Sequence, residues 1–261
     1  MSDHIILFFV SLLANFLSAL AGGGAGLLQL PALIFLGLPF STAMATHKIA
    51  TVTLGMGASF KHLRAGTLDL KFAGFILLAG LPGVIIGAFG AVHLPEILAK
   101  TCLGLLTMSL GIYSWSKKEL GQLSAPANRH SAGLIKGALV IFIIGILNGA
   151  LASGTGLFVT LWLIRWFGLD YKQAVAYTMI LVGLFWNGSG ALAVNLLNPA
   201  QWSWLPALIA GSIIGGYAGT HIAISKGNGF IKIMFEILTL ACGLWLLWNA
   251  WQPHILSNNL V

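Results

Sequence analysis

The chain has 261 residues, of which 58% are hydrophobic and only 7% are charged, and its mean hydropathy is +0.93. Soluble domains carry about 25% charged residues, so this composition excludes a water-soluble globular protein and makes lipid the main solvent. The net charge of +7 is not gathered on a soluble domain. It therefore favours basic loops beside a membrane, and we expect no nucleic-acid partner.

Long apolar runs recur along the whole chain, and each is continuous rather than alternating in polarity. Continuous runs of roughly 20 residues are typical of transmembrane helices, whereas barrel strands alternate, so we predict an all-α polytopic membrane protein. The first run has no Lys or Arg before it, and we expect it to be retained as the first helix. The predicted segments are 4–20, 27–38, 41–60, 70–91 and 96–116, then 133–152, 157–167, 173–195, 202–223 and 230–251.

The longest polar stretch, 117–131, predicts a linker between two membrane repeats at 1–116 and 132–261. The repeats match in sequence: the glycine-rich stretch 22–28 aligns with 152–158, and 43–46 aligns with 174–177. The pair Gly83 and Gly87 likewise aligns with Gly211 and Gly215. Similar motifs in the same order indicate an internal repeat.

The second segment of each repeat has only 12 or 11 residues, which a helix extends over about 18 Å or less. These segments are either re-entrant, giving eight spans, or short crossings, giving ten. Ten crossings place eleven Lys and Arg residues on one side and two on the other, whereas eight crossings divide them seven to six. Positive-inside asymmetry favours ten crossings, with a cytoplasmic linker, both termini outside and two inverted repeats of five segments.

Glycine-rich breaks precede both short segments, at Gly22–Gly26 and at 153–156. Broken helices in inverted repeats are typical of the binding sites of secondary transporters. A helix that begins at membrane depth directs its positive end inward, which suits an anion. The alternative interpretation is that these glycines only allow tight helix packing.

Lys48 lies inside the apolar segment 41–60, beside His47. An ionisable side chain at this depth indicates a functional site, here a counter-ion for an anion. The alternative is a lysine whose ammonium extends to the membrane interface. Gln29 and Asn148 lie close to the two breaks and could donate amide N–H groups to substrate oxygens.

The residues Gly22 to Leu33, followed by Gly37-Leu38-Pro39 and Ala43 to Thr46, resemble the TauE/SafE sulfite exporter family. The second copy, with Gly154-Thr155-Gly156 and Gly168-Leu169, is similar to the second repeat of that family. The resemblance implies a multi-pass transporter of the bacterial cytoplasmic (inner) membrane. It also implies sulfite, an organosulfonate or a related sulfur-containing anion as the substrate.

We therefore predict a secondary transporter or exporter of a small anion that works by alternating access. The alternatives are an ion-coupled importer of another organic acid or oxyanion, and a membrane scaffold or sensor without flux. No acid–base, nucleophile or nucleotide motif is present in the sequence, so we expect no enzyme, no cofactor and no metal site. The sequence leaves open a coupling ion, either proton or sodium, and assembly as a homodimer. The predicted substrate-binding residues are Gly22, Gly23, Gly24, Gly26, Gln29, Thr46, His47, Lys48, Asn148, Ser153, Gly154, Thr155, Gly156, Tyr177 and Thr178.

Overall fold

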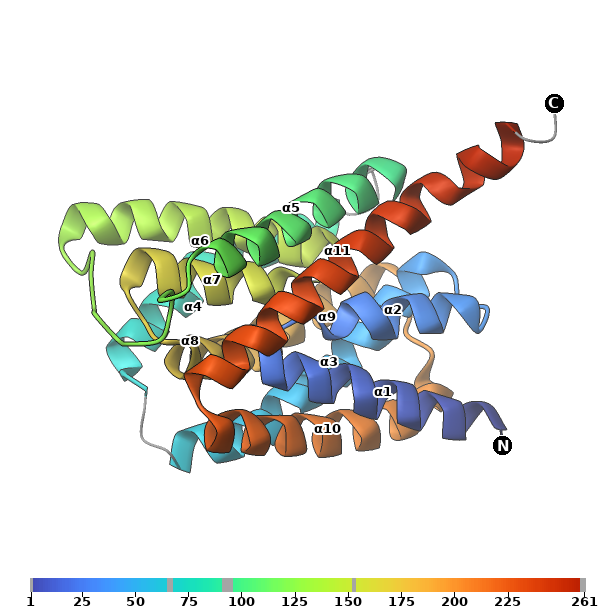
Figure 1. Cartoon of the computed structure of the whole chain (residues 1–261). Helices are drawn as coiled ribbons and strands as arrows, with labels where there is room; N and C mark the ends of the chain where they lie inside the picture. Colours follow the sequence, from blue (N-terminus) through green and yellow to red (C-terminus); the bar gives the residue numbers. More distant parts are fainter. Residues whose placement is uncertain (1, 65–67, 91–95, 152–153, 259–261) are drawn as a thin grey trace.

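The structure is a computed structural model that describes residues 2–64, 68–90, 96–151 and 154–258 (Figure 1). The described chain is 86% helix and contains no strand. The predicted all-α class is therefore confirmed. The first half contains α1 (Ser2–Ala21), α2 (Ala25–Phe35), α3 (Phe40–Arg64), α4 (Leu70–Gly90) and α5 (Glu96–Ser116).

The second half repeats this order of long and short helices. Its third segment is continuous from Tyr171 to Leu197, but the middle of that segment is a π-helix, which its apolar sequence does not predict. The elements are α6 (Ser131–Leu151), α7 (Thr155–Phe167), α8 (Tyr171–Tyr177), η2 (Thr178–Trp186), α9 (Asn187–Leu197), η3 (Trp202–Trp204), α10 (Leu205–Lys226) and α11 (Asn228–Asn258).

Six helices of the described chain are long and apolar enough to cross a membrane. The helices α2 and α7 are also apolar but have only 11 and 13 residues, which correspond to roughly 16 and 20 Å. They are shorter than the ~30 Å hydrocarbon core. The six long segments are Asp3–Ala21, Leu70–Gly90, Ser131–Leu151, Tyr171–Leu197, Trp202–Lys226 and Asn228–Trp251.

Successive segments run back and forth along the horizontal direction of Figure 1, with both termini at one end and the linker at the other. Hydrogen bonds fix the linker to the turns of the second half. The carbonyl of Gly121 accepts from the Tyr171 N–H at 2.9 Å. The carbonyl of Gln122 accepts from the Asn228 side-chain amide at 2.8 Å. The linker is therefore an ordered part of this end of the protein.

Arg129 attaches the linker to helices of both halves. Its guanidinium carbon lies 3.3 Å from the ring centroid of Phe72 in α4 and 5.5 Å from that of Phe167 in α7. Such cation–π contacts strengthen as they are desolvated. Burial lowers the pKa of Arg129 from its ordinary value, and Tyr177 and Asp69 oppose that shift. The guanidinium remains charged, because arginine is always protonated in proteins.

Glycines allow helices from opposite halves to touch through their backbones. On α4, a methyl group at Gly83 or Gly87 would collide with the carbonyl oxygens of Phe142 and Ile146 on α6. This close approach is typical of helix packing in lipid, where small residues bring backbones together. The fourth segment of the first half therefore packs on the first segment of the second half.

The fourth segment of the second half, α10, packs in the same way on the first segment of the first half, α1. On α10, methyl groups at Gly211 and Gly215 would collide with the backbone of α1, at Phe8 and Leu12. These are the glycines that the sequence aligns with those of α4. The two halves thus pack on each other reciprocally, through glycine pairs that the predicted repeat relates.

Candidate substrate-binding site

The two glycine-rich breaks meet in the middle of the protein. Gly23 has a φ of +146°, which side-chain-bearing residues rarely adopt. A methyl group on it would lie 2.6 Å from the Leu157 nitrogen and 2.7 Å from the Gly156 carbonyl carbon. The break before α2 is therefore in backbone contact with the first turn of α7, and only glycine fits there.

Both short helices begin at this contact without a side-chain cap. Their N-cap residues, Gly24 and Gly154, adopt left-handed conformations with φ of 100° and 72°. The first N–H groups of a helix have no carbonyl acceptor within the helix. The aligned peptide dipoles also place about half a positive charge at each N-terminus. Two uncapped, positive helix ends therefore converge in the protein interior.

A cavity of about 40 Å³ lies where these helix ends meet. It is far smaller than the roughly 300–1,000 Å³ of pockets for drug-sized ligands, so it suits an ion of few atoms. All of its lining residues are buried except Asn187, which is half-buried. They are Ser18, Gly23, Gly24, Ala25, Gly26, His47, Thr51, Leu54, Asn148, Gly154, Thr155, Gly156, Thr178, Met179, Val182, Gly183 and Asn187.

Several lining residues occupy matching positions in the two predicted repeats. The alignment of 22–28 with 152–158 pairs Ser18 with Asn148. The separate alignment of 43–46 with 174–177, continued by one residue, pairs His47 with Thr178. The first alignment also pairs Gly24 with Gly154 and Gly26 with Gly156. The cavity is thus built from the same helical positions of both halves, with different side chains on each side.

Polar side chains around the cavity are held by specific hydrogen bonds. The amide nitrogen of Asn148 donates to the Thr155 hydroxyl at 2.8 Å, and its buried amide oxygen has no hydrogen-bond partner in the described part of the chain. The amide of Asn187 donates to the Thr51 hydroxyl at 3.2 Å. A buried amide oxygen without a partner is costly, which indicates that water or a ligand group binds beside it.

Lys48 lies behind this wall rather than on the cavity surface. It is fully buried, and its ammonium donates to the carbonyl of Asn148 at 2.9 Å. That carbonyl is in the last turn of α6, at the negative end of the helix dipole, which a cation stabilises. No carboxylate pairs with Lys48 among the residues that the structure describes. Gly190 of α9 leaves room for it, because a methyl group there would lie 3.0 Å from the ammonium nitrogen.

His47 lies on the cavity wall, while Gln29 points away from it. The Nδ1 atom of His47 is 3.1 Å from the Gln29 amide oxygen. The Gln29 amide nitrogen in turn donates to the Ser11 hydroxyl of α1 at 3.3 Å. Gln29 therefore orients His47 without lining the cavity itself.

Three further predicted residues lie outside the lining. Thr46 accepts a hydrogen bond from the Gln201 N–H at 2.9 Å and so holds the connection between α9 and α10. The hydroxyl of Tyr177 is 2.8 Å from the Asp69 nitrogen, at the end with the linker. The carbonyl of Gly22 accepts from Thr160 at 2.8 Å. The structure brings the other predicted residues together at the cavity, apart from Lys48, Gln29 and Ser153, the last of which lies outside the described residues.

The predicted site lacked several residues that line the cavity. Thr51 follows His47 by one helical turn, and Ser18 is the repeat partner of Asn148, so both positions could have been deduced from the alignment. Met179, Val182 and Gly183 belong to the π-helix, whose register the sequence does not reveal. In the described residues, no three His, Cys, Asp or Glu side chains come together as metal ligands.

The chain matches the family described as sulfite exporter TauE/SafE over residues 7–246. A probable membrane transporter protein of Haemophilus influenzae is 28% identical to it, over 90% of this chain and 90% of the relative. The probable membrane transporter protein ORF9 of a Sinorhizobium species is 27% identical over 95% of this chain and 93% of the relative. YfcA of Escherichia coli K12, also named a probable membrane transporter protein, is 26% identical over 96% of this chain and 92% of the relative. No solved structure matches this chain.

The family match includes both glycine breaks and both short helices, which carried the resemblance in the sequence. The relatives are named as transporters, in agreement with a protein that carries a solute rather than converts one. Six membrane-length helices agree with a multi-pass protein. The chain therefore belongs to the TauE/SafE sulfite exporter family and is a multi-pass membrane transporter.

Proposed function

We propose that this transporter moves a small sulfur oxyanion, sulfite or a short organosulfonate, across the bacterial inner membrane by alternating access. The observation that carries the proposal is the convergence of the N-termini of α2 and α7 on one buried polar cavity. Uncapped helix N-termini bind sulfate, phosphate and carboxylate groups in many proteins. Here two of them face the same small space.

The charges around the cavity favour an anion over a cation. The two helix ends together contribute about one positive charge. Lys48 adds an ammonium behind the wall, and none of the lining residues that the structure describes is acidic. An anion in the cavity would therefore interact favourably with the two helix ends and with the Lys48 ammonium.

The proposed ligands are backbone and side-chain donors from both halves. The first-turn N–H groups of Gly26 and Gly156 would bind anion oxygens, with His47 and Thr178 also in the lining. Lys48 would act through the Asn148 carbonyl that it holds, and through its charge. Gln29 would orient His47. Of the other predicted residues, Thr46, Tyr177 and Gly22 would support the surrounding helices.

The burial of the site and the reciprocal packing of the two halves support alternating access. An anion reaches a cavity with buried walls only if helices move. The breaks at Gly24 and Gly154 are the positions where each half could bend. Rocking of one repeat against the other around a fixed site is the mechanism that inverted-repeat transporters share.

Loop charge supports the orientation in the membrane. Lys61, Arg64, Lys71, Lys117 and Lys118 lie in or beside turns at the linker end, as do most of the remaining basic residues. We propose that this end faces the cytoplasm and that both termini face the periplasm. Reporter fusion at the C-terminus would be active in the periplasm if this orientation is correct.

Counterflow in proteoliposomes tests the function. Vesicles loaded with unlabelled sulfite should take up radiolabelled sulfite, with competition by methanesulfonate that is stronger than competition by acetate. Preference for acetate would favour the alternative of an organic-acid importer, and the same assay under proton or sodium gradients would identify its coupling ion. Absence of counterflow for every anion would contradict transport of this class and favour a scaffold or sensor.

A further inference from the structure

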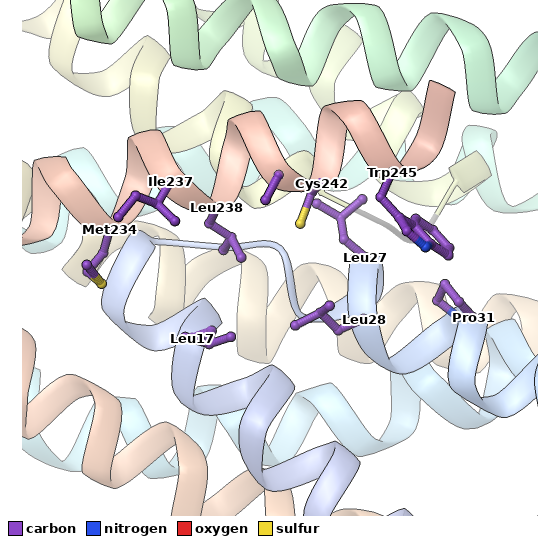
Figure 2. A pocket seen from close by; sticks show the side chains of 10 residues that line it. Leu17, Leu27, Leu28, Pro31, Met234, Ile237, Leu238, Cys242 and Trp245 are labelled. Atoms are coloured by element: carbon purple, nitrogen blue, oxygen red, sulfur yellow. The ribbon is translucent and has the colours of Figure 1, made fainter. Parts of the chain in front are cut away.

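A second, larger space lies beside the polar cavity, between α11 and the first two helices (Figure 2). This apolar groove has a volume of about 490 Å³ and is lined only by apolar and sulfur-containing side chains, with Trp245 at one end. Its floor is formed by the buried residues Leu27, Leu238 and Cys242, and its rim by the exposed residues Leu28 and Trp245. Its volume lies within the roughly 300–1,000 Å³ of ordinary ligand pockets.

The floor of the apolar groove is also the outer wall of the polar cavity. A methyl group on Gly24 would lie 3.1 Å from the Leu238 side chain, and one on Gly154 would lie 3.2 Å from the Leu27 side chain. Both glycines line the polar cavity, and both leucines line the groove. A single layer of leucine side chains over glycine therefore separates the two spaces.

The first turn of α2 lines both the polar cavity and the apolar groove. Ala25 and Gly26 border the polar cavity, while the next two residues, Leu27 and Leu28, border the apolar groove. A ligand bound through oxygen atoms at the start of α2 would thus have its non-polar part beside Leu27. Leu27 therefore lies between the two spaces.

We propose that the apolar groove receives the hydrocarbon tail of an amphipathic anion whose charged head occupies the polar cavity. The inference rests on the proposed function and defines its substrate class, namely an anionic head group attached to an alkyl chain. A bilayer lipid would also place hydrocarbon in such a groove, but the shared wall and the shared turn of α2 connect this groove to the anion site. Leu27 is the side chain that must move to admit the tail.

The chain length of the substrate tests this proposal. Competition with labelled sulfite is measured in proteoliposomes for n-alkanesulfonates from methanesulfonate to hexanesulfonate. Burial of one methylene corresponds to roughly a three- to fourfold gain in affinity, so the inhibition constant should fall by about that factor per carbon. Without a tail site, the inhibition constant would not change along the series.

Variants with a larger side chain in the apolar groove test whether the hydrocarbon tail binds there. Ala241→Phe places a ring in the groove, so it should abolish the gain with chain length and leave the affinity for sulfite unchanged. Leu244→Phe is the matched control, because Leu244 is exposed on the same helix and does not line the groove. Leu28→Trp, at the rim, is a second variant if Ala241→Phe does not yield folded protein.

The outcomes separate the two proposals. If neither sulfite nor methanesulfonate competes, the proposed function itself fails. If both compete but longer sulfonates gain nothing, the function stands and the tail site is wrong. A full gain with chain length in both Ala241→Phe and Leu28→Trp would also overturn the tail site, because the tail would then bind elsewhere.

Discussion

The short helices α2 and α7 begin in the same way but end in different surroundings. Both start at an uncapped glycine beside the polar cavity. Ten of the thirteen residues of α7 are buried, against six of the eleven residues of α2. The last residue of α2, Phe35, is 90% exposed, whereas the last residue of α7, Phe167, is fully buried. α7 is thus enclosed by protein, while much of α2 faces outward.

The linker accounts for much of this difference. Its backbone and one side chain bind the carbonyl groups at the end of α7, which would otherwise lack partners. On the other side of the molecule, α2 contains Pro31 and borders the apolar groove. We infer that α7 is the fixed half of the site and α2 the half that moves. The linker bonds are Ala125 N to Gly168 O, Ala127 N to Phe167 O and Asn128 Nδ2 to Trp166 O.

The largest effect is expected where the two breaks touch. Gly23→Ala should abolish counterflow and lower the free energy of unfolding by roughly 2–4 kcal/mol, because it combines backbone strain with collision against α7. Gly37→Ala is the matched control, since Gly37 has a φ of +100° but nothing within 4 Å of an added methyl group. Thermal unfolding in detergent and sulfite counterflow measure both. Equal effects of the two variants would show that the contact between the breaks is unimportant.

Removal of the buried ammonium should have the next largest effect. Lys48→Met introduces the residue type that the repeat alignment places at Met179 in the other half. It removes a charge near the cavity and leaves the Asn148 carbonyl unpaired, at a cost of about 1–3 kcal/mol. Counterflow should fall at least tenfold, with a higher KM for sulfite. Lys136→Met, on an exposed part of α6, should change neither quantity, and unaltered transport by Lys48→Met would remove Lys48 from the site.

A smaller effect on stability is expected where the linker binds the carbonyl groups at the end of α7. Asn128 has a φ of 54° and donates to the Trp166 carbonyl at 2.7 Å. Asn128→Gly keeps this backbone conformation and deletes the hydrogen bond, so the free energy of unfolding should fall by about 1 kcal/mol. Counterflow should be retained, because the cavity is unaffected. A loss of transport larger than the loss of stability would instead assign a direct role in transport to the linker.

The smallest effect is expected at the end of α2. Phe35→Ala removes an exposed ring that closes no part of the site, so stability should change by less than about 0.5 kcal/mol. Thermal unfolding measured beside Asn128→Gly compares the ends of the two short helices directly. A larger loss for Phe35→Ala than for Asn128→Gly would reverse the assignment of the fixed and the mobile half.

Much of the fold could be predicted from hydropathy and glycine positions, because each segment in lipid must satisfy its own backbone hydrogen bonds. The predicted segment 27–38 corresponds to α2 at Ala25–Phe35, and 157–167 to α7 at Thr155–Phe167. The π-helix at 178–186 could not be predicted in this way. Its residues read as an ordinary apolar run, and its register depends on packing around Gly183 and Gly55.

The position of the candidate cavity was predictable, but not every side chain that lines it. The glycine breaks located the cavity, because a broken helix leaves backbone groups that a cavity can use. Whether a polar residue faces that cavity depends on the rotation of its helix and on its neighbours. Gln29 therefore binds Ser11, and Thr46 binds the Gln201 nitrogen, although both lie close in sequence to the break or to His47.

We propose that an anion binds where the first turns of α2 and α7 converge. Anomalous diffraction from crystals of the protein soaked in selenite, a heavier analogue of sulfite, would locate that anion. One anomalous peak is expected at the selenium position, close enough to the Gly26 and Gly156 nitrogen atoms for selenite oxygens to accept hydrogen bonds from both. This peak should be weaker in Lys48→Met. A peak at another position at saturating selenite, with the cavity unoccupied, would contradict this proposal.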